Sequence, residues 1–303
     1  MSVQSGISPA AGRQGPGAMP SPIVEALDLV MARRASGALP GEHVAPGVGT
    51  GTELAQIRPY EVGDDVRQLD PSATARTGVP HIKLQVPERL LTTWILLDLS
   101  PSMAFGTADR LKSDVAEGVV TVVGRLGTRR GGRIALMTCG APHVRFVRPR
   151  GGRGALISLR RVLHEGVAED GAAAALTLAA GLRRIARIAR QPGLVVVVSD
   201  FRGPLDWTGP IRSLAWRHSV LGIEVRDPRE AALPALGRLR LVDPETGQQI
   251  EVDTSDPELR ERFETAEGAE RDAVAKALRR ARAEHVVLST GGRWLKELGR
   301  RLR

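Results

Sequence analysis

Two short apolar segments, each running into polar residues, constrain the fold of this chain most. WILLDLS spans residues 94–100 and GLVVVVSD spans residues 193–200. A short apolar run bounded by turn residues is consistent with a strand that is buried on both faces of a sheet. From residue 93 onward, strand-like and helix-like segments alternate. This alternation predicts an α/β fold, with a doubly wound, mostly parallel sheet and helices on both faces.

The composition fits such a sheet and bounds its size. Aromatic residues make up only 3% of the 303 residues, so the core must be mainly aliphatic. A chain of this length can bury one large core, or a core and a smaller module. We expect a disordered tail at residues 1–21, then an N-terminal helix (22–36), linker and turn-rich module at residues 22–92, and the α/β domain at residues 93–303.

Within the α/β domain, the patterns predict individual elements. A helix is expected near 108–126, with a mostly apolar stripe that begins at Lys112. The segments 132–140 and 143–149, separated by a short polar turn, predict a hairpin, and a second hairpin is expected over 238–253. The remaining expected elements are a helix-rich stretch at 154–190, strands at 219–227 and 285–290, and helices at 257–283 and 294–303.

The net charge of +9 leaves several classes of partner open. Arginine supplies almost all of the positive charge, because the chain has only four lysines. Such a balance indicates nucleic acid, an acidic membrane surface or an acidic protein, unless the charges are simply spread over the surface. A basic nucleic-acid-associated protein is the weaker alternative, because few aromatic side chains are present to stack on bases.

Location and redox chemistry follow from what the chain lacks. No apolar run approaches the ~18 residues of a membrane span, and no signal peptide heads the sequence, so a cytoplasmic protein is expected. Cys139 is the single cysteine, which excludes an intramolecular disulfide, and its apolar surroundings predict an inert core thiol.

The polar residues that follow the two apolar strands predict a metal site. Asp98, Ser100 and Ser102 stand at alternate positions where the first strand ends, so their oxygens can converge on one point. Asp200 follows the second strand, and adjacent parallel strands end at the same edge of a sheet. Such hard oxygen ligands suit Mg²⁺ or Mn²⁺. The alternative is that these residues only cap helices or form turns.

The same segments do not predict an enzyme. Phosphatases of the haloacid dehalogenase type place a second aspartate two residues after the nucleophile, and Ser100 stands there in this chain. No Gly-x-Ser-x-Gly motif frames a serine, and the six histidines lack metal-ligand spacing. We therefore expect no catalytic residues and a protein that binds rather than reacts.

A charged turn lies upstream, in residues 57–78. Gly63, Asp64 and Asp65 predict a tight turn, and Arg58, Arg67, Arg76 and Asp70 flank it. Arginine–carboxylate pairs would fix this irregular segment, so we interpret it as scaffolding rather than as a ligand contact.

The motif Asp98-x-Ser100-x-Ser102 resembles the metal-ion-dependent adhesion site of von Willebrand factor A domains. The resemblance implies that the two serines ligate the metal directly, and that Asp98 and Asp200 hold it mainly through water. It also implies a threonine from a third loop. Thr177 lies one residue beyond the matching position, and the alternative is that it is an ordinary helix residue.

Further short motifs occur in a fixed order over about residues 50–300. They are Arg58-Pro59-Tyr60, Gly63-Asp64-Asp65-Val66-Arg67, Asp70, Ala75-Arg76, Asp98-Leu99-Ser100-Pro101-Ser102-Met103, Phe105-Gly106, Arg110-Leu111-Lys112, Ser199-Asp200-Phe201 and Asp243-Pro244-Glu245-Thr246-Gly247. In this order the chain resembles the bacterial family called domain of unknown function 58, with Pro71 where the family usually has Trp.

That family resembles von Willebrand factor A domains, and its members commonly accompany MoxR-type AAA+ ATPases. The resemblance therefore implies a non-enzymatic adaptor or chaperone-like partner of such an ATPase. A metal with few charged ligands would stay electrophilic and keep an open position for a partner's Glu or Asp. The alternative is a metal-free interaction scaffold in which the degenerate site only shapes a loop.

Overall fold

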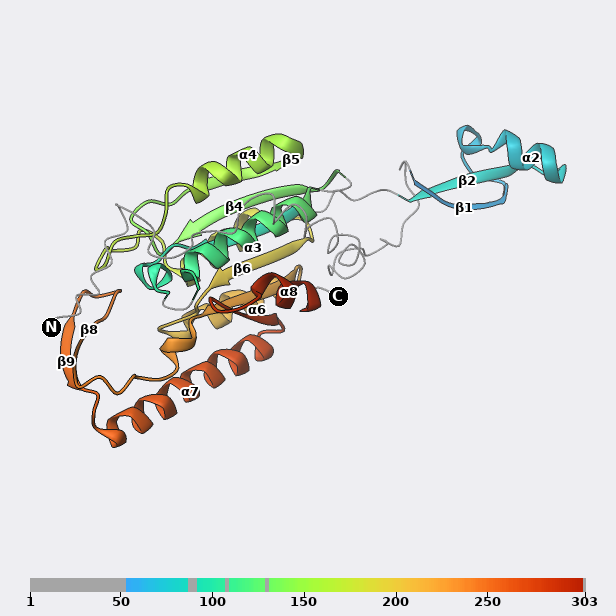
Figure 1. Ribbon diagram of the computed structural model, residues 1–303. Helices are drawn as coiled ribbons and strands as arrows, with labels where there is room; N and C mark the ends of the chain where they lie inside the picture. The colour runs from blue at the N-terminus through green and yellow to red at the C-terminus, as the bar shows by residue number, and fades with distance from the viewer. Residues whose placement is uncertain (1–52, 87–91, 107–108, 129–130, 302–303) are drawn as a thin grey trace. The chain divides into compact units, whose positions relative to one another are not determined.

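A computed structural model describes residues 53–86, 92–106, 109–128 and 131–301 of the chain (Figure 1). The expected tail at 1–21 and the expected helix at 22–36 lie outside the described residues. By contacts the chain divides into two compact units, one of them formed by Glu42–Leu90. Each unit is described by itself below.

The larger unit contains a six-stranded sheet with the strand order β10-β7-β6-β3-β4-β5. All neighbouring strands are parallel except β5, which pairs antiparallel with β4. The strands are β3 (Thr92–Asp98), β4 (Arg133–Cys139), β5 (Phe146–Gly151), β6 (Leu194–Ser199), β7 (Ser219–Arg226) and β10 (Glu284–Ser289). Numbered within this sheet, the order is 3-2-1-4-5-6, that of a doubly wound fold. The order in which successive strands are added reverses between the parallel neighbours β3 and β6.

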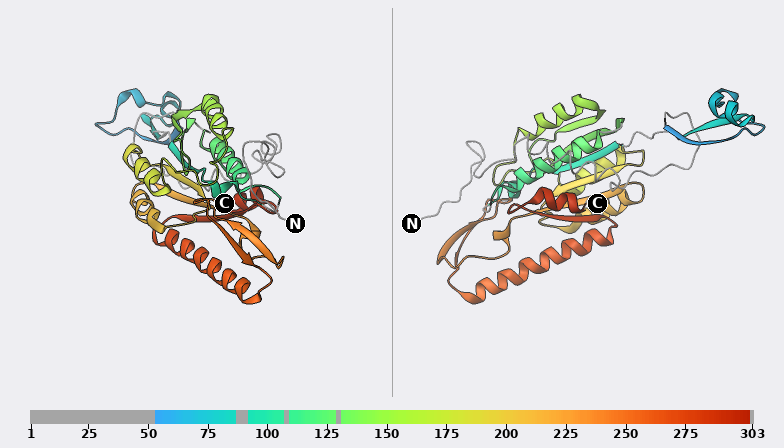
Figure 2. Two further views of the ribbon diagram at one scale, coloured as in Figure 1. Left: turned by 90° about the vertical axis from the view of Figure 1, so that its left-hand side faces the viewer. Right: turned by 45° about the vertical axis from the view of Figure 1, so that its right-hand side comes forward.

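Helices cover both faces of this sheet, as the two views in Figure 2 show. One face packs against α3 (Lys112–Gly127), α4 (Gly152–Leu163) and α8 (Trp294–Arg301), and the other against α5 (Leu178–Ile188), α6 (Thr208–Ala215) and α7 (Pro257–Arg280). The two apolar clusters take alternate residues of each central strand, for instance Ile95 and Leu97 on one side and Leu96 on the other. The predicted α/β fold, with a mostly parallel sheet and helices on both faces, is confirmed.

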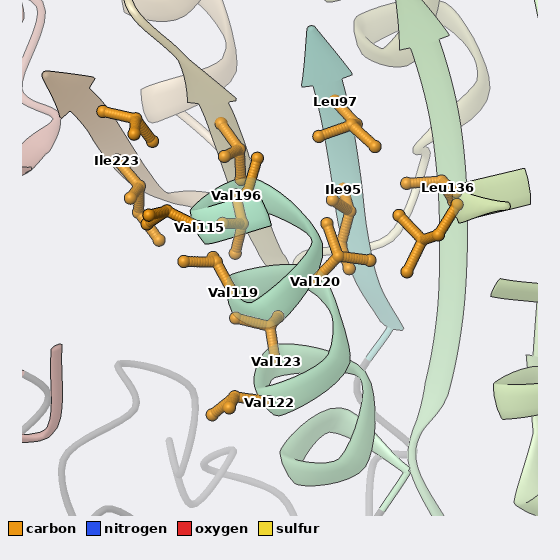
Figure 3. Packing of buried hydrophobic residues seen from close by; sticks show 14 of the residues in the cluster. Ile95, Leu97, Val115, Val119, Val120, Val122, Val123, Leu136, Val196 and Ile223 are labelled. Atoms are coloured by element: carbon orange, nitrogen blue, oxygen red, sulfur yellow. The ribbon is translucent and has the colours of Figure 1, made fainter. Parts of the chain in front are cut away.

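The packing of α3 shows why the sequence folds in this way. Its valines recur every three or four residues, so they form one stripe along the helix. This stripe lies against side chains from four adjacent strands (Figure 3). The residues labelled there are Val115, Val119, Val120, Val122 and Val123 of the helix, and Ile95, Leu97, Leu136, Val196 and Ile223 of the strands, all members of one buried apolar cluster. Full burial of one such side chain contributes about 1.5–3 kcal/mol.

Both predicted hairpins are present. The first is formed by β4 and β5, and β5 begins at Phe146 and runs to Gly151, later than the expected 143–149. The strand β5 is exposed along most of its length and its register with β4 shifts between Ile134 and Leu136. The second hairpin consists of β8 (Arg238–Val242) and β9 (Gln249–Asp253) and forms a sheet of its own. Cys139 is buried, as expected.

The smaller unit pairs β1 (Glu53–Pro59) antiparallel with β2 (His81–Val86), and carries α2 (Pro71–Thr77) between them. The Asp70 carboxylate accepts hydrogen bonds from Ser72 N and Ala73 N and so caps α2. Pro71 occupies the first turn of this helix, where its missing N–H costs no hydrogen bond.

The expected arginine–carboxylate pairing in this unit is found at Asp64. Its carboxylate accepts a hydrogen bond from Arg58 Nη2 at 2.7 Å and another from Glu61 N. The Arg58 guanidinium holds the pKa of Asp64 below its usual range. Asp65 has a different role, because its carboxylate accepts from Arg67 N and caps the short helix Val66–Gln68.

In the described part of the chain, no helix is both long enough and apolar enough to cross a lipid bilayer.

Candidate functional site

The candidate site lies where β3 and β6 end, at the point where the order of the sheet reverses. Asp98 is the last residue of β3, and Asp200 directly follows β6. Ser199 Oγ donates a hydrogen bond of 2.6 Å to Asp98 Oδ2 and so ties the two strand ends together. Ligands of open α/β sheets bind in this position.

The two serines of the motif meet at this edge. Ser100 N donates to Asp98 Oδ1 at 3.0 Å, which folds the chain back beside the strand end. The short helix Pro101–Ala104 then places Ser100 Oγ 3.1 Å from Ser102 Oγ, and both serines are buried. The structure therefore brings four of the five predicted site residues together: Asp98, Ser100, Ser102 and Asp200.

A close approach of the backbone supports this arrangement. Gly140 follows β4 with a φ of +77°, and a Cβ placed there would lie 2.4 Å from Asp98 Oδ1 and 2.5 Å from Ser100 N. Only glycine fits the space beside these two atoms without a shift of the loop.

Thr177, the fifth predicted residue, caps a helix. Its hydroxyl accepts a hydrogen bond from Ala180 N and so begins α5. The preceding residue, Leu176, accepts from Gly140 N, which places this segment next to the end of β4. The cap is the ordinary helical role weighed for Thr177, and metal ligation by Thr177 remains a prediction.

Sequence reasoning missed Lys112, which lies at the site. Its side chain is completely buried, and its Nζ donates to Asp200 Oδ2 at 2.7 Å and to Glu230 Oε1 at 2.6 Å. The signal was present in the sequence, because Lys112 begins the apolar stripe of its helix and must point inward with it.

Beyond Lys112, the ion pairs continue through Glu230 toward α7. Arg202 Nε lies 3.4 Å and Arg271 Nη2 lies 3.5 Å from carboxylate oxygens of Glu230. Both arginines also pair with Glu267 on α7, at 2.8 Å. This network holds the residues after β6 in place with charge-assisted hydrogen bonds.

The two aspartates differ in their electrostatic surroundings. Burial, followed by repulsion from Asp200, raises the pKa of Asp98 to about 6. Burial would also raise the pKa of Asp200, but the Lys112 ammonium and hydrogen bonds from Lys112, Arg202 N and Ser102 hold that pKa below its ordinary value.

The donor set fits a hard divalent cation at Asp98. The hydrogen bonds to the Asp98 carboxylate come from the neutral groups Ser100 N and Ser199 Oγ, and within the described segments Asp98 forms no ion pair. A buried carboxylate without a cationic partner, beside two hydroxyl oxygens, is suited to Mg²⁺ or Mn²⁺. No group of three or more His, Cys, Asp or Glu side chains among the described residues forms an alternative metal site.

A further carboxylate reaches the site from a distant part of the chain. Glu245, in the turn between β8 and β9, accepts a hydrogen bond of 3.2 Å from Ser102 N. Its motif was noted in the sequence, but local patterns give no sign that the second hairpin folds back onto the first strand end.

Comparisons with known proteins agree with the sequence motifs. The family model described as "Protein of unknown function DUF58" matches residues 56–273. The uncharacterized protein Rv1480 of Mycobacterium tuberculosis is 37% identical over 275 residues, which cover 90% of this chain and 86% of that protein. The uncharacterized protein MAV169 of Mycobacterium avium is 40% identical over 123 residues, or 41% of this chain and 72% of that protein.

Among solved structures, the conserved hypothetical protein BatB from Bacteroides thetaiotaomicron matches with a TM-score of 0.43 and 14% identity, over 70% of this chain and 97% of that structure. The SpRpn10 VWA domain matches with a TM-score of 0.36 and 14% identity, over 69% of this chain and 93% of that structure.

Proposed function

The chain belongs to the DUF58 family, whose function is unknown, and from this premise we propose that it is a non-enzymatic protein-binding module whose contact with its partner requires a divalent cation at Asp98. The observation that carries the proposal is the buried Asp98 carboxylate, which has neutral hydrogen-bond donors and no cationic partner in the described structure. Binding of a cation would relieve the cost of burying that charge.

The residues have separate tasks in this proposal. Ser100 and Ser102 offer hydroxyl oxygens to the cation, and Asp98 and Asp200 supply negative charge around it. Bound there, Mg²⁺ or Mn²⁺ supplies an electrophilic centre for a carboxylate of the partner. Lys112 keeps Asp200 ionised and fixed in position, because its ammonium is 2.7 Å from that carboxylate.

The first experiment compares thermal unfolding in EDTA and in excess Mg²⁺. A ligand that binds only the folded state at 100 times its Kd stabilises that state by about 2.7 kcal/mol. We expect a higher Tm in Mg²⁺ for the wild type and no difference for the double variant Ser100→Ala/Ser102→Ala. Ser213→Ala, an exposed serine on α6, is the control and should respond to Mg²⁺ like the wild type.

Lys112 favours a second candidate function, a metal-free interaction scaffold. Its ammonium already neutralises Asp200 and sits within the site, where a cation would otherwise carry the charge. In that case the wild type unfolds at the same temperature in EDTA and in saturating Mg²⁺ or Mn²⁺. Identical unfolding curves would therefore exclude the metal-dependent module and leave the scaffold.

As the partner we propose a MoxR-type AAA+ ATPase, on the basis of the family resemblance. The test is binding between the purified full-length chain and a purified MoxR-type ATPase from the same genome, in Mg²⁺ and in EDTA. We expect binding in Mg²⁺ only, and loss of binding in Asp98→Asn with the fold retained. Equal binding in EDTA, or by Asp98→Asn, would contradict the metal-dependent contact.

A further inference from the structure

The hairpin formed by β8 and β9 contributes a carboxylate to the site from 143 residues further along the chain. Glu245 Oε1 accepts a hydrogen bond of 3.2 Å from Ser102 N, the amide of the second residue of the short helix Pro101–Ala104. Figure 1 shows this hairpin as a separate ribbon beyond the strands of the main sheet. Glu245 is exposed, so its burial in a core does not explain the contact.

The turn is built to direct Glu245 at the site. Asp243 accepts hydrogen bonds from Glu245 N at 3.1 Å and from the Thr246 hydroxyl at 2.6 Å, which fixes the residues on either side of the carboxylate. Pro244 O accepts from Gly171 N at 2.9 Å, so the turn also rests on the loop before α5. These contacts determine where Glu245 points.

The arms of the hairpin are held far less firmly than its two ends. None of the residues of β8 or β9 is buried. At the base, Thr254 is fully buried and bonds to Gly237 O through both its N–H and its hydroxyl, each at 2.8 Å. Elements with few buried contacts open at low free-energy cost while the rest of the fold stays intact. To pivot about this base, the hairpin must break the hydrogen bonds at its tip, from Gly171 N to Pro244 O and from Ser102 N to Glu245 Oε1, but it exposes no buried residue of β8 or β9.

We propose that Glu245 is a built-in carboxylate that occupies the position offered to the partner's carboxylate, and that a partner binds only when the hairpin lifts away. This inference rests on the proposed function for its metal-dependent part. The hairpin then has two states, closed with Glu245 at Ser102 and open with the site available. A partner carboxylate must compete with Glu245, and this competition selects against weak acidic ligands.

The first test concerns the contact itself and needs no metal. Amide hydrogen exchange at Ser102 is measured in EDTA for the wild type, Glu245→Gln and Glu251→Gln. Glu251 lies on β9 of the same hairpin and is exposed, so it controls for the loss of one charge. We expect Ser102 to exchange at least about tenfold faster in Glu245→Gln, since that fold-change corresponds to about 1.4 kcal/mol. Equal exchange in all three proteins would overturn the proposal.

The second test counts open positions on a bound cation. Mn²⁺ is added to the same three proteins, and the relaxation rate of water protons is measured per bound ion. With Glu245 closed, fewer water molecules reach the ion, so Glu245→Gln should give a higher rate than the wild type and Glu251→Gln should not. Mn²⁺ binding with equal rates in all three would overturn the role of Glu245.

The two tests separate this inference from the proposed function. If none of the proteins binds Mn²⁺, the proposed metal-dependent module is wrong. The claim that Glu245 takes the place of a partner's carboxylate at a bound cation is then also wrong, whatever the exchange result. If Mn²⁺ binds and the exchange of Ser102 does not respond to Glu245→Gln, the proposed function stands and the built-in carboxylate is wrong.

Discussion

At the scale of single residues, the two aspartates of the site, Asp98 and Asp200, differ in their hydrogen-bond and ion-pair partners. Asp200 has the Lys112 ammonium at 2.7 Å, and Asp98 has only neutral donors. An ionised carboxylate with no counter-charge is costly to bury, which is why the pKa of Asp98 rises to about 6. The charge of Asp98 should therefore affect stability in a measurable way.

We predict that Asp98 makes the metal-free protein less stable as the pH rises from about 4 to 6. The folded protein binds the Asp98 proton more tightly than the unfolded chain does, because the pKa of Asp98 rises from 3.8 to about 6 on folding. Protonated Asp98 therefore contributes to the free energy of unfolding below pH 4. This contribution, about 3 kcal/mol, is lost as the pH rises through 6. Asp98→Asn carries no such proton. In EDTA, urea unfolding should show its stability improving relative to the wild type by this amount between pH 4 and pH 7.

His218 does not disturb this comparison. Burial lowers the pKa of His218, so its contribution to stability has the opposite sign and increases with pH. Both proteins contain His218, and its contribution cancels in the difference between them. Parallel pH profiles for the wild type and Asp98→Asn would contradict the assigned environment of Asp98.

Lys112→Met should be strongly destabilising. The substitution leaves Asp200 and Glu230 facing each other without the ammonium that pairs with both. Removal of one partner from a buried ion pair costs about 3–5 kcal/mol, measured as the loss in free energy of unfolding in urea. The control is Lys276→Met, since Lys276 is 59% exposed and pairs only loosely with Asp272 at 3.8 Å. A loss of less than about 1 kcal/mol for Lys112→Met would mean that its charge is not needed at the site.

At the scale of elements, the end of β4 supports the site through a glycine. We predict that Gly140→Ala destabilises the protein more than Gly166→Ala, measured by urea unfolding. The two glycines have nearly the same φ, +77° and +78°, so the backbone strain of about 1–2 kcal/mol is common to both. Only at Gly140 does the new methyl group meet Asp98 and Ser100, since nothing lies within 4 Å of a Cβ at Gly166. Equal losses in the free energy of unfolding for the two variants would show that the loop after β3 moves to accommodate the methyl group without cost.

Elements that follow from local patterns were predicted well from the sequence. The runs that became β3 and β6 are apolar and short, and the order of strands and helices fixes which strand ends meet. That is why Asp98 and Asp200 could be placed at one edge. The short helix α6 was not predicted, because Gly209 and Pro210 in its first turn conceal the helical pattern.

The rest of the site depends on contacts that no local pattern contains. Glu245 reaches Ser102 because a whole hairpin folds back across the edge of the sheet. The apolar stripe of its helix indicates that Lys112 points inward, but its pairing with Asp200 follows from where the helix begins relative to the end of β6, which no local pattern contains. Asp64 is the carboxylate that pairs with Arg58, whereas the neighbouring Asp65 caps a helix. Which of the two aspartates takes which role depends on the geometry of the turn.

At the scale of the whole molecule, the chain contains two compact units, and each has its own network of contacts. In the unit formed by Glu42–Leu90, the pair Arg58–Asp64 ties the end of β1 to the turn that follows. We expect Asp64→Ala to loosen this unit alone. Amide hydrogen exchange should accelerate across β1 and β2, while the strands of the six-stranded sheet keep their protection.

Glu61→Ala is the matched control for Asp64→Ala. Glu61 is 81% exposed on its side chain and lies 3.8 Å from Arg58, so its loss should leave the exchange of β1 and β2 nearly unchanged. Faster exchange in the six-stranded sheet of Asp64→Ala would show that the two units unfold together.

The outer strand β5 has a consequence for the behaviour of the protein in concentrated solution. An unpaired strand edge is a template on which further chains can polymerise. Here that edge carries Arg148 and Arg150 on either side of Pro149, which has no N–H to donate, and its register with β4 is interrupted. Charge, proline and an irregular register each discourage the addition of another strand. The β5 edge is thus protected against the addition of a further strand, independently of binding at the carboxyl edge of the sheet.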